Sequence, residues 1–278
     1  MQLEGYTALR FRVERGVVFA TIDHPPINLF DGPLIVDLDR FGREVEADPD
    51  VRVAVIDSAN PEFFIAHADL NLILQLPRET QPAPTELSVF QAMVDRFRTM
   101  PKVTIAVIEG RTRGGGSELV LAMDMRFAAR GRALLAQPEV ALGIIPGGGG
   151  TQRLPRLVGR ARALEIVLGC EDIDADLAER WGYVNRALAE DELRPFVEAL
   201  AFRIASFPTE AVAHAKAAVG AAETHVVPGL LDEAHRFAQT LAAEQTITRM
   251  ERFLELGGQT REFELALDFD PNELAPGT

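Results

Sequence analysis

The sequence predicts an α/β fold that is followed by a helical carboxy-terminal portion. Short apolar runs rich in β-branched residues occur at 51–56 and 103–108, which is typical of buried strands. Apolar residues recur at helical spacing between such runs, as over 31–45. Beyond about residue 150 the strand signals fade and helical patterns follow one another.

The amino-terminal elements are expected in a fixed order. Alternating residues over 8–13, a turn at 14–16 and a second run over 17–22 predict a hairpin. After the first helix and strand, further helices are expected at 69–76 and 86–100.

Two glycine-rich segments each precede an expected helix. Residues 114–116 are glycines and lead into the apolar run 119–123, which predicts a buried helix. Residues 146–150 lead into a helix that starts at 151–154. Further helices are expected at 160–168, 174–180, 190–206, 208–222, 229–256 and 258–267.

Length and composition are those of a globular protein. The chain has 278 residues, 47% hydrophobic and 25% charged, enough for one large domain or a domain with an appendage. No apolar run approaches the roughly 18 to 20 residues of a membrane span, and the first residues do not resemble a secretory signal. The single cysteine, Cys170, excludes an internal disulfide. We therefore expect a cytoplasmic protein with no membrane partner.

Charge is unevenly distributed along the chain. The net charge of −14 argues against nucleic-acid binding, which needs a positive surface. Residues 110–162, however, hold nine arginines and three acids, so this window is +6 and the remainder is −20. Either these arginines lie scattered on solvated faces, or they form a positive region that attracts an anionic small molecule.

The glycine-rich segments do not match nucleotide-binding motifs. Neither is followed by the lysine of a phosphate-binding loop. The dinucleotide pattern would need glycine at positions occupied by Gln152 and Leu119. The histidines form no His-Glu-x-x-His pair, so we expect neither a metal nor a nucleotide cofactor.

Two glutamates are candidates for chemistry. Glu118 follows three glycines at the expected start of an apolar helix, where it either caps the helix or faces a ligand. Glu139 is a lone carboxylate between two apolar segments, so it is either a paired, half-buried acid or a functional one. The residues alone leave both alternatives open.

The chain resembles the enoyl-CoA hydratase/isomerase (crotonase) family. The resemblance rests on stretches in family order at 63–70, 114–119, 137–139 and 143–154. It implies a spiral of ββα units with the active site over 1–205 and a helical trimerisation region over 206–278. A homotrimer or a dimer of trimers is the assembly that this resemblance implies.

The resemblance also implies where an acyl-CoA thioester would bind. The backbone N–H groups of Ala68 and Gly115 would form an oxyanion hole for the thioester oxygen. No separate cofactor is implied, because coenzyme A is part of the substrate. The implied substrate-binding residues are Ala66, Asp69, Leu70, Asn71 and Gly147.

Hydratases of the family have two glutamates, and both positions are glutamate here. The resemblance therefore implies that Glu118 orients and deprotonates a water while Glu139 protonates C2 of a trans-2-enoyl thioester. One of the two would be held protonated by burial and by its neighbour. An isomerase or another acyl-CoA-transforming member of the family is an alternative, as is a non-catalytic acyl-CoA-binding scaffold.

Two residues depart from the family pattern. His67 stands where the family usually has glycine, which suggests an unusual backbone angle. Its side chain either points away from the acyl group or adds a polar group to the site. Asn71 replaces a basic residue of several relatives, which puts one coenzyme A contact in doubt.

Overall fold

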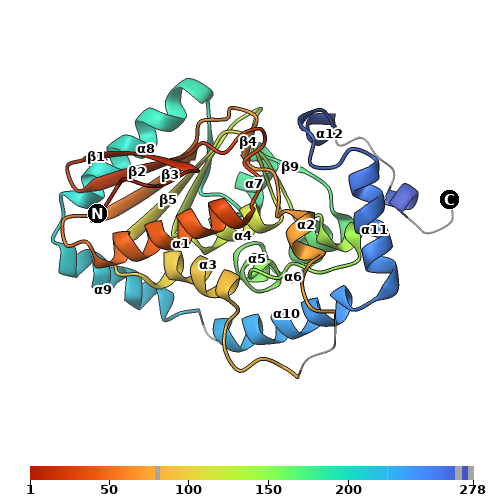
Figure 1. The fold of residues 1–278 in the computed structure, drawn as a ribbon. Helices are drawn as coiled ribbons and strands as arrows, with labels where there is room; N and C mark the ends of the chain where they lie inside the picture. The colour runs from red at the N-terminus through yellow and green to blue at the C-terminus, as the bar shows by residue number, and fades with distance from the viewer. Residues whose placement is uncertain (79–81, 224, 267–270, 275–278) are drawn as a thin grey trace.

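A six-stranded sheet forms one layer of the fold (Figure 1). The computed structural model describes residues 1–78, 82–223, 225–266 and 271–274. The first two strands are antiparallel, and every later pair in this sheet is parallel. In spatial order the strands are β1 (Leu9–Glu14), β2 (Val17–Ile22), β3 (Val53–Ser58), β5 (Val103–Ile108), β7 (Met125–Ala129) and β10 (Arg186–Leu188).

A second, four-stranded sheet alternates with the first along the chain. Its strands, in spatial order, are β4 (Phe63–Ile65), β6 (Arg111–Arg113), β8 (Leu134–Ala136) and β9 (Ile173–Asp174). Three times in succession a strand of the large sheet is followed by one of the small sheet and then by helix. This repeat is a spiral of ββα units, and it confirms the expected fold class.

Helices surround the sheets. The helices of the spiral are α1 (Gly32–Ala47), α2 (Leu70–Ile73), α3 (Val89–Thr99), α4 (Gly115–Ala122), the 3-10 turn η1 (Glu139–Leu142), α5 (Gly150–Val158), α6 (Arg160–Gly169) and α7 (Ala175–Trp181). The later helices are α8 (Glu190–Ala205), α9 (Thr209–Gly220), α10 (Val226–Leu241), α11 (Glu244–Glu255), α12 (Arg261–Ala266) and the 3-10 turn η2 (Pro271–Leu274).

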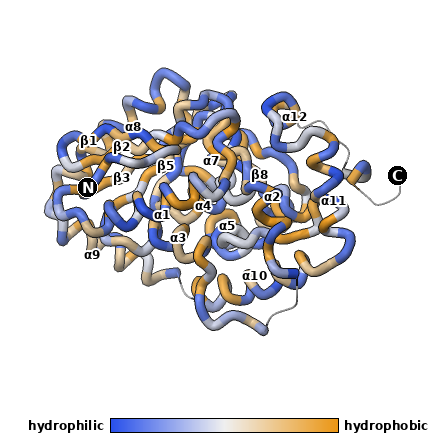
Figure 2. Tube along the Cα trace, viewed as in Figure 1, coloured by the Kyte–Doolittle hydropathy of each residue, from blue (hydrophilic) through white to orange (hydrophobic). Residues whose placement is uncertain are grey.

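The two faces of the large sheet pack against different helices. On β2, Val18 and Ala20 join the hydrophobic cluster that includes α1 and α3, whereas Val17 and Phe19 join the cluster that includes α8. This alternation follows from the two-residue period of a strand. Figure 1 shows α1 and α3 on one side of the sheet and α8 on the other. The alternating colours of α1 in Figure 2 show the amphipathic helix that such packing requires.

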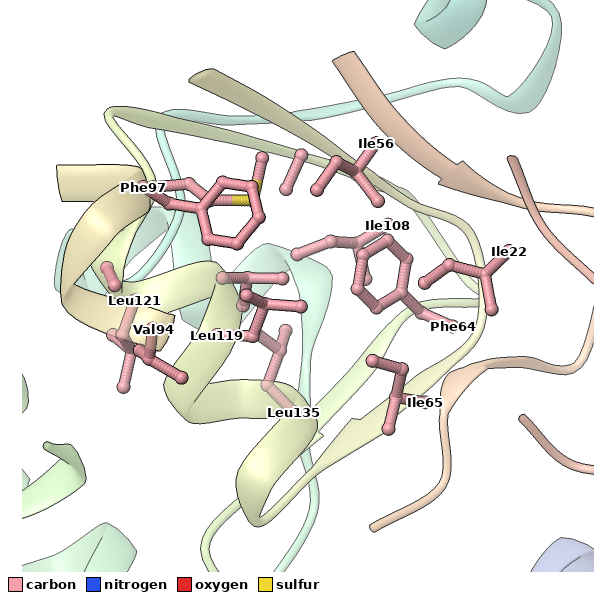
Figure 3. Packing of buried hydrophobic residues seen from close by; sticks show 14 of the residues in the cluster. Ile22, Ile56, Phe64, Ile65, Val94, Phe97, Ile108, Leu119, Leu121 and Leu135 are labelled. Carbon is pink, nitrogen blue, oxygen red and sulfur yellow. The ribbon is translucent and has the colours of Figure 1, made fainter. Parts of the chain in front are cut away.

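Helix α4 lies at the centre of the molecule. All of its residues are buried. Figure 3 shows Leu119 and Leu121 of α4 among side chains of both sheets, including Ile108, Phe64 and Leu135. A helix that is apolar on every side has to be surrounded by protein. Its amino terminus, and Glu118 with it, is thereby held in a fixed position.

The structure confirms most of the expected elements and corrects several. The hairpin, the strand over 103–108 and the helices over 31–45 and 190–206 are present with nearly the expected bounds. The helix expected over 69–76 is the much shorter α2. The helix expected over 258–267 is α12, and residue 267 lies outside the described residues.

Two further expectations about the second half were wrong. The segment 229–256 is not one helix, because α10 and α11 are separated by an extended Ala243. At this break the Thr246 hydroxyl lies within hydrogen-bond distance of the carbonyl oxygens of Thr240 and Gly143. Such contacts cannot be predicted from the spacing of apolar residues along a helix. Two strands, β9 and β10, also occur beyond residue 150, where none was expected. Both are too short to show the alternation of apolar and polar residues that predicts a strand, and they form by pairing with β8 and β7.

Among the described residues, no helix combines the length and apolarity needed to cross a bilayer.

Candidate active site

The carboxyl group of Glu118 binds the loop that precedes α5. Glu118 lies in the first turn of α4 and is only 3% exposed. Its Oε1 atom accepts hydrogen bonds from Gly148 N at 2.7 Å and from Gly150 N at 2.8 Å. A methyl group on Gly148 would lie 2.7 Å from Glu118 Oε2, so only glycine lets the loop approach the carboxylate this closely.

Glu139 reaches the same region from η1. It is 8% exposed, and a methyl group on Gly114 would lie 3.1 Å from its Oε1 atom. Gly114 immediately precedes α4 and has a φ of +50°, in the region that favours glycine. The two glutamates are thus held at the amino-terminal end of α4, one on its first turn and one beside the residue before it.

A chain of polar side chains holds Glu139 from behind. The Gln137 amide lies between the Ser117 hydroxyl and the Glu139 carboxyl group, 3.1 Å from each. Its nitrogen donates to the Glu139 carboxyl group, and its oxygen accepts from the Ser117 hydroxyl. Ser117 in turn hydrogen-bonds the buried Tyr183 hydroxyl. This chain fixes the orientation of the Glu139 carboxyl group.

The environments of the two glutamates favour different protonation states. Burial raises the pKa of Glu118, but the N–H groups of Gly150 and Gly148 oppose this shift. Burial and the negative charge of Glu118 raise the pKa of Glu139 well above its ordinary value. Glu139 therefore holds a proton more strongly than Glu118, and Glu118 is the member of the pair that ionises first.

The structure brings the two predicted oxyanion-hole residues together. A methyl group on Gly115 would lie 3.7 Å from Ala68 Cβ. Phe30 forms a parallel β-bridge with Ala68, in which Phe30 N donates to His67 O and Asp69 N donates to Phe30 O. The bridge uses the groups of the two neighbouring residues and not the N–H of Ala68. Within the described residues, neither the Ala68 nor the Gly115 N–H has a hydrogen-bond acceptor. Both amides are thus available to a ligand.

Two phenylalanines that the sequence analysis missed form an apolar wall beside these amides. The rings of Phe30 and Phe90 meet edge to face with their centroids 5.2 Å apart. A methyl group on Gly115 would lie 3.3 Å from each ring, and one on Gly148 would lie 2.4 Å from Phe90 Cε1. Phe90 therefore lies between the amide of Gly115 and the loop that binds Glu118. Nothing in their local sequence distinguishes them from other core phenylalanines.

The residues implied to contact coenzyme A surround α2. Asp69 caps α2 by accepting from Asn71 N at 2.9 Å, and Leu70 is buried in a separate hydrophobic cluster with α11. Ala66 is fully buried, and its amide donates to Ile27 O at 3.2 Å. These residues form one continuous segment, from the end of β4 into α2, that includes the Ala68 amide.

Gly147, the last of the implied binding residues, lies elsewhere in the site. It belongs to the loop before α5, and a methyl group on it would lie 3.0 Å from the Phe237 ring of α10. Helix α10 therefore covers the loop that carries the Glu118 hydrogen-bond donors.

The arginine-rich window does not form a free positive surface. Arg126 is buried and donates to the carbonyl oxygens of Tyr183, Val120 and Met123. Four other arginines form ion pairs with acids outside the window: Arg113 with Asp172, Arg130 with Asp176, Arg132 with Glu190 and Arg153 with Asp95. Four of the nine positive charges are therefore neutralised within the fold, and Arg113, Arg126 and Arg153 are buried, which neither of the two alternatives anticipated.

A third buried acid, Glu233, lies beside the pair. Its Oε2 atom accepts from Thr151 N at 2.9 Å and from the Thr151 hydroxyl. Its Oε1 atom is buried with no hydrogen-bond partner among the described residues. Burial, followed by the charge of Glu118, raises the pKa of Glu233 to about 8. Sequence reasoning missed Glu233 because it is one acid in a helical pattern with many polar positions.

His67 occupies an ordinary backbone conformation. It is absent from the described residues with positive φ, so the unusual backbone angle suggested by the family glycine was wrong. Its ring Nδ1 lies 2.8 Å from Ala68 O, and its Nε2 lies 3.0 Å from Glu264 Oε1. The side chain thus points toward α12. In the part of the chain that the structure describes, no group of three or more metal-ligating side chains occurs.

The fold and the site together define a class of protein. The protein has a ββα spiral, and the unpaired main-chain amides of Ala68 and Gly115 lie near the amino-terminal end of α4. The buried carboxyl groups of Glu118 and Glu139, which differ in proton affinity, lie at the same end of this helix. Such a site can stabilise a developing oxyanion and move protons beside it.

Comparison with known proteins identifies the family. The sequence profile of the enoyl-CoA hydratase/isomerase family matches residues 12–261, and the chain belongs to this family. A crotonyl-CoA hydratase of Syntrophomonas wolfei is 37% identical over 212 residues, which cover 76% of this chain and 80% of the relative.

Solved structures agree with this assignment. A Streptomyces avermitilis protein provisionally called an enoyl-CoA hydratase superposes with a TM-score of 0.88 at 38% identity, covering 97% of this chain and 98% of that one. An enoyl-CoA hydratase from Mycobacterium avium subsp. paratuberculosis superposes with a TM-score of 0.79 at 25% identity, covering 91% of this chain and 97% of that one.

Proposed function

We propose that this protein is an enoyl-CoA hydratase that adds water reversibly to a trans-2-enoyl-CoA thioester. The observation that supports this most directly is the pair Glu118 and Glu139, buried together next to the free amide of Gly115. Hydration needs a base for water and an acid for C2, and this pair offers one carboxyl group suited to each role. An isomerase needs a single glutamate, so the second acid favours hydration.

Glu118 is the proposed base. The two N–H donors on Oε1 oppose the rise in the Glu118 pKa that burial causes, so Glu118 ionises more readily than Glu139, and Oε2 remains to accept a proton. The water oxygen bonds to C3 of the enoyl group while its proton passes to Glu118. The electron pair of the double bond moves toward the thioester oxygen, which becomes an enolate.

The amides of Ala68 and Gly115 are the proposed donors to that enolate oxygen. They are fixed before the reaction, so they stabilise the developing charge without reorganisation, and each is worth about 3 to 4 kcal/mol. Gly115 N–H also lies in the first turn of α4, where the helix dipole favours negative charge.

Glu139 is the proposed acid. Its high proton affinity keeps it protonated until the enolate forms, and it then delivers its proton to C2. The cycle closes when the proton taken by Glu118 returns to Glu139 through solvent or product exchange. Each acid–base step is worth about 10²- to 10⁴-fold in rate.

The assembly and location expected from the sequence remain part of this proposal: a homotrimer or a dimer of trimers in the cytoplasm. Helix α9 supports an assembly, because none of its residues is buried within the chain. Mass photometry of the purified protein measures the number of subunits directly.

The test of the function is a panel of enoyl-CoA thioesters of different chain lengths, assayed by the loss of conjugated-enoyl absorbance with identification of the product. A 3-hydroxyacyl-CoA product is expected. A shifted double bond would indicate the isomerase instead. Tight acyl-CoA binding without turnover of any chain length would indicate the scaffold.

A further inference from the structure

We propose that His67 is a positioning residue for the oxyanion hole: as an imidazolium it links the Ala68 carbonyl group, one peptide unit beyond the Ala68 N–H, to Glu264 of helix α12. The inference rests on the proposed function, because it is the Ala68 amide that the tether would hold in place.

The protonation state of the His67 ring follows from the groups that its two nitrogen atoms contact. Nδ1 lies 2.8 Å from a main-chain carbonyl oxygen, which can only accept a hydrogen bond. Nε2 lies 3.0 Å from a carboxylate oxygen of Glu264. Beside an ionised Glu264, a neutral imidazole has one N–H and would leave one of these contacts without a hydrogen. A doubly protonated ring satisfies both, and Glu264 supplies the balancing charge.

The surroundings of Glu264 support an ionised carboxylate. The side chain is fully buried, and Oε1 also accepts from Gln259 N at 2.8 Å. Arg113 lies 3.7 Å from Oε2 and donates to the Glu264 carbonyl oxygen at 3.3 Å. Arg113 is itself paired with Asp172, and Glu139 approaches His67 from across Gly114. A buried carboxylate with a cation on each side is far more stable than an unpaired one.

The electrostatic shifts agree with an ion pair. Burial alone would lower the pKa of His67, but the hydrogen bond and charge of Glu264 outweigh burial and raise it. Burial would raise the pKa of Glu264, but the hydrogen bond and charge of His67 outweigh it and lower it. The pair's stabilisation is therefore lost as pH rises through the raised pKa of His67, and also as pH falls through the lowered pKa of Glu264.

A second set of contacts joins the segment 67–71 to the segment 259–264. Gln259 Nε2 donates to Asp69 Oδ1 at 3.0 Å, and Asn71 Nδ2 donates to Gln259 Oε1 at 3.2 Å. The carboxy-terminal segment thus holds the 67–71 loop at both ends. A glycine at position 67 could make no such side-chain link.

The proposal is tested with His67→Gln and Glu264→Gln. An oxyanion hole acts in the transition state, so kcat and kcat/KM should fall together, by about 10- to 100-fold, which is less than the about 10²- to 10³-fold loss of a deleted donor. The double variant should be little worse than either single one, because both break one link. His214→Gln is the control, since His214 is exposed on α9 and lies in none of the segments that form the site.

The pH profile separates positioning from general destabilisation. In the wild-type protein kcat should fall at alkaline pH as His67 loses its proton. Glu264→Gln should move this fall to lower pH, because it removes the balancing charge and keeps an acceptor. His67→Gln should abolish the contribution of His67 and leave only the alkaline fall caused by deprotonation of Glu139, the proposed acid, whereas a Glu233→Gln variant should retain both contributions. Full activity of His67→Gln with an unchanged profile would overturn the proposal.

A measurement without activity keeps the inference distinct from the proposed function. Nitrogen-15 NMR of the wild-type protein should show two protonated His67 ring nitrogens at neutral pH, and loss of that state in Glu264→Gln. A neutral His67 ring at neutral pH would refute the tether even if hydration is confirmed. Absence of hydration with an intact imidazolium would refute only the proposed function and leave the ion pair established.

Discussion

Glu118 and Glu233 hydrogen-bond the amino-terminal end of α5 and the loop before it, although they come from different helices. Glu118 accepts from Gly148 N and Gly150 N, and Glu233 accepts from Thr151 N. The exposed N–H groups and the dipole of a helix amino terminus stabilise negative charge there. Two carboxylates share this one source of stabilisation, and Glu118 has the larger number of donors. The arrangement explains why Glu118 ionises more readily than its neighbours.

The first prediction concerns the two proposed catalytic acids. Glu118→Gln and Glu139→Gln should each lower kcat by about 10²- to 10⁴-fold, because each removes one proton-transfer group. In Glu118→Gln the pKa of Glu139 should also move down, since the charge that helps to raise it is gone. Steady-state kinetics and carbon-13 NMR of the labelled carboxyl group measure the two effects. Full hydratase activity in either variant would contradict the assigned roles.

The second prediction concerns the close approach at Gly148. In Gly148→Ala the methyl group would lie 2.4 Å from Phe90 Cε1 and 2.7 Å from Glu118 Oε2, so the loop must move. We expect the free energy of unfolding to fall by about 1 to 3 kcal/mol, as in other overpacked sites. We also expect kcat to fall because the donors to Glu118 shift.

The control for Gly148 is Gly220→Ala in α9. Nothing lies within 4 Å of a methyl group at that position. This variant should keep full activity and show equal or slightly higher stability, since alanine favours a helix. Urea denaturation measures both variants. Equal stability of Gly148→Ala and the wild type would contradict the prediction, because it would show that the loop accommodates a methyl group at position 148.

The third prediction concerns Glu233 and pH. The pKa of Glu233 is raised from 4.5 to about 8, so unfolding releases a proton between these values and stability falls as pH rises through this range. Glu233→Gln keeps an acceptor for Thr151 but has no charge to bury. Its melting temperature should therefore exceed that of the wild type by an amount that grows from pH 4.5 to about pH 8 and is constant above. A difference that does not change with pH would refute a buried, titrating Glu233.

The fourth prediction concerns the chain that holds Glu139. Gln137→Leu removes the amide between Ser117 and Glu139 and leaves their buried polar groups unpaired. Stability should fall by about 1 to 3 kcal/mol, and kcat should fall because Glu139 is no longer oriented. Tyr183→Phe removes a hydroxyl further along the chain, so its effect on kcat should be smaller. The reverse order of effects would show that the chain does not run from Tyr183 to Glu139.

Several features of the site could be predicted from the sequence because they follow local patterns. The glycines before Glu118 and before α5, and the lone carboxylate at 139, stand out against their neighbours. The free amides at Ala68 and Gly115 came from resemblance, and the structure places the two residues together. The positive window was misleading, since summed charge ignores the acids that pair with it from distant segments.

The sequence by itself determined the hairpin, the strand over 103–108, the family and the pair Glu118 and Glu139, because each follows from short-range periodicity or from a compact motif. Only the tertiary structure decided that Glu233 joins the pair, that Phe30 and Phe90 form the wall, and that His67 meets Glu264. These contacts join residues far apart in the chain, and packing selects them among many side chains of the same type. Short sequence patterns therefore cannot predict which of these side chains meet.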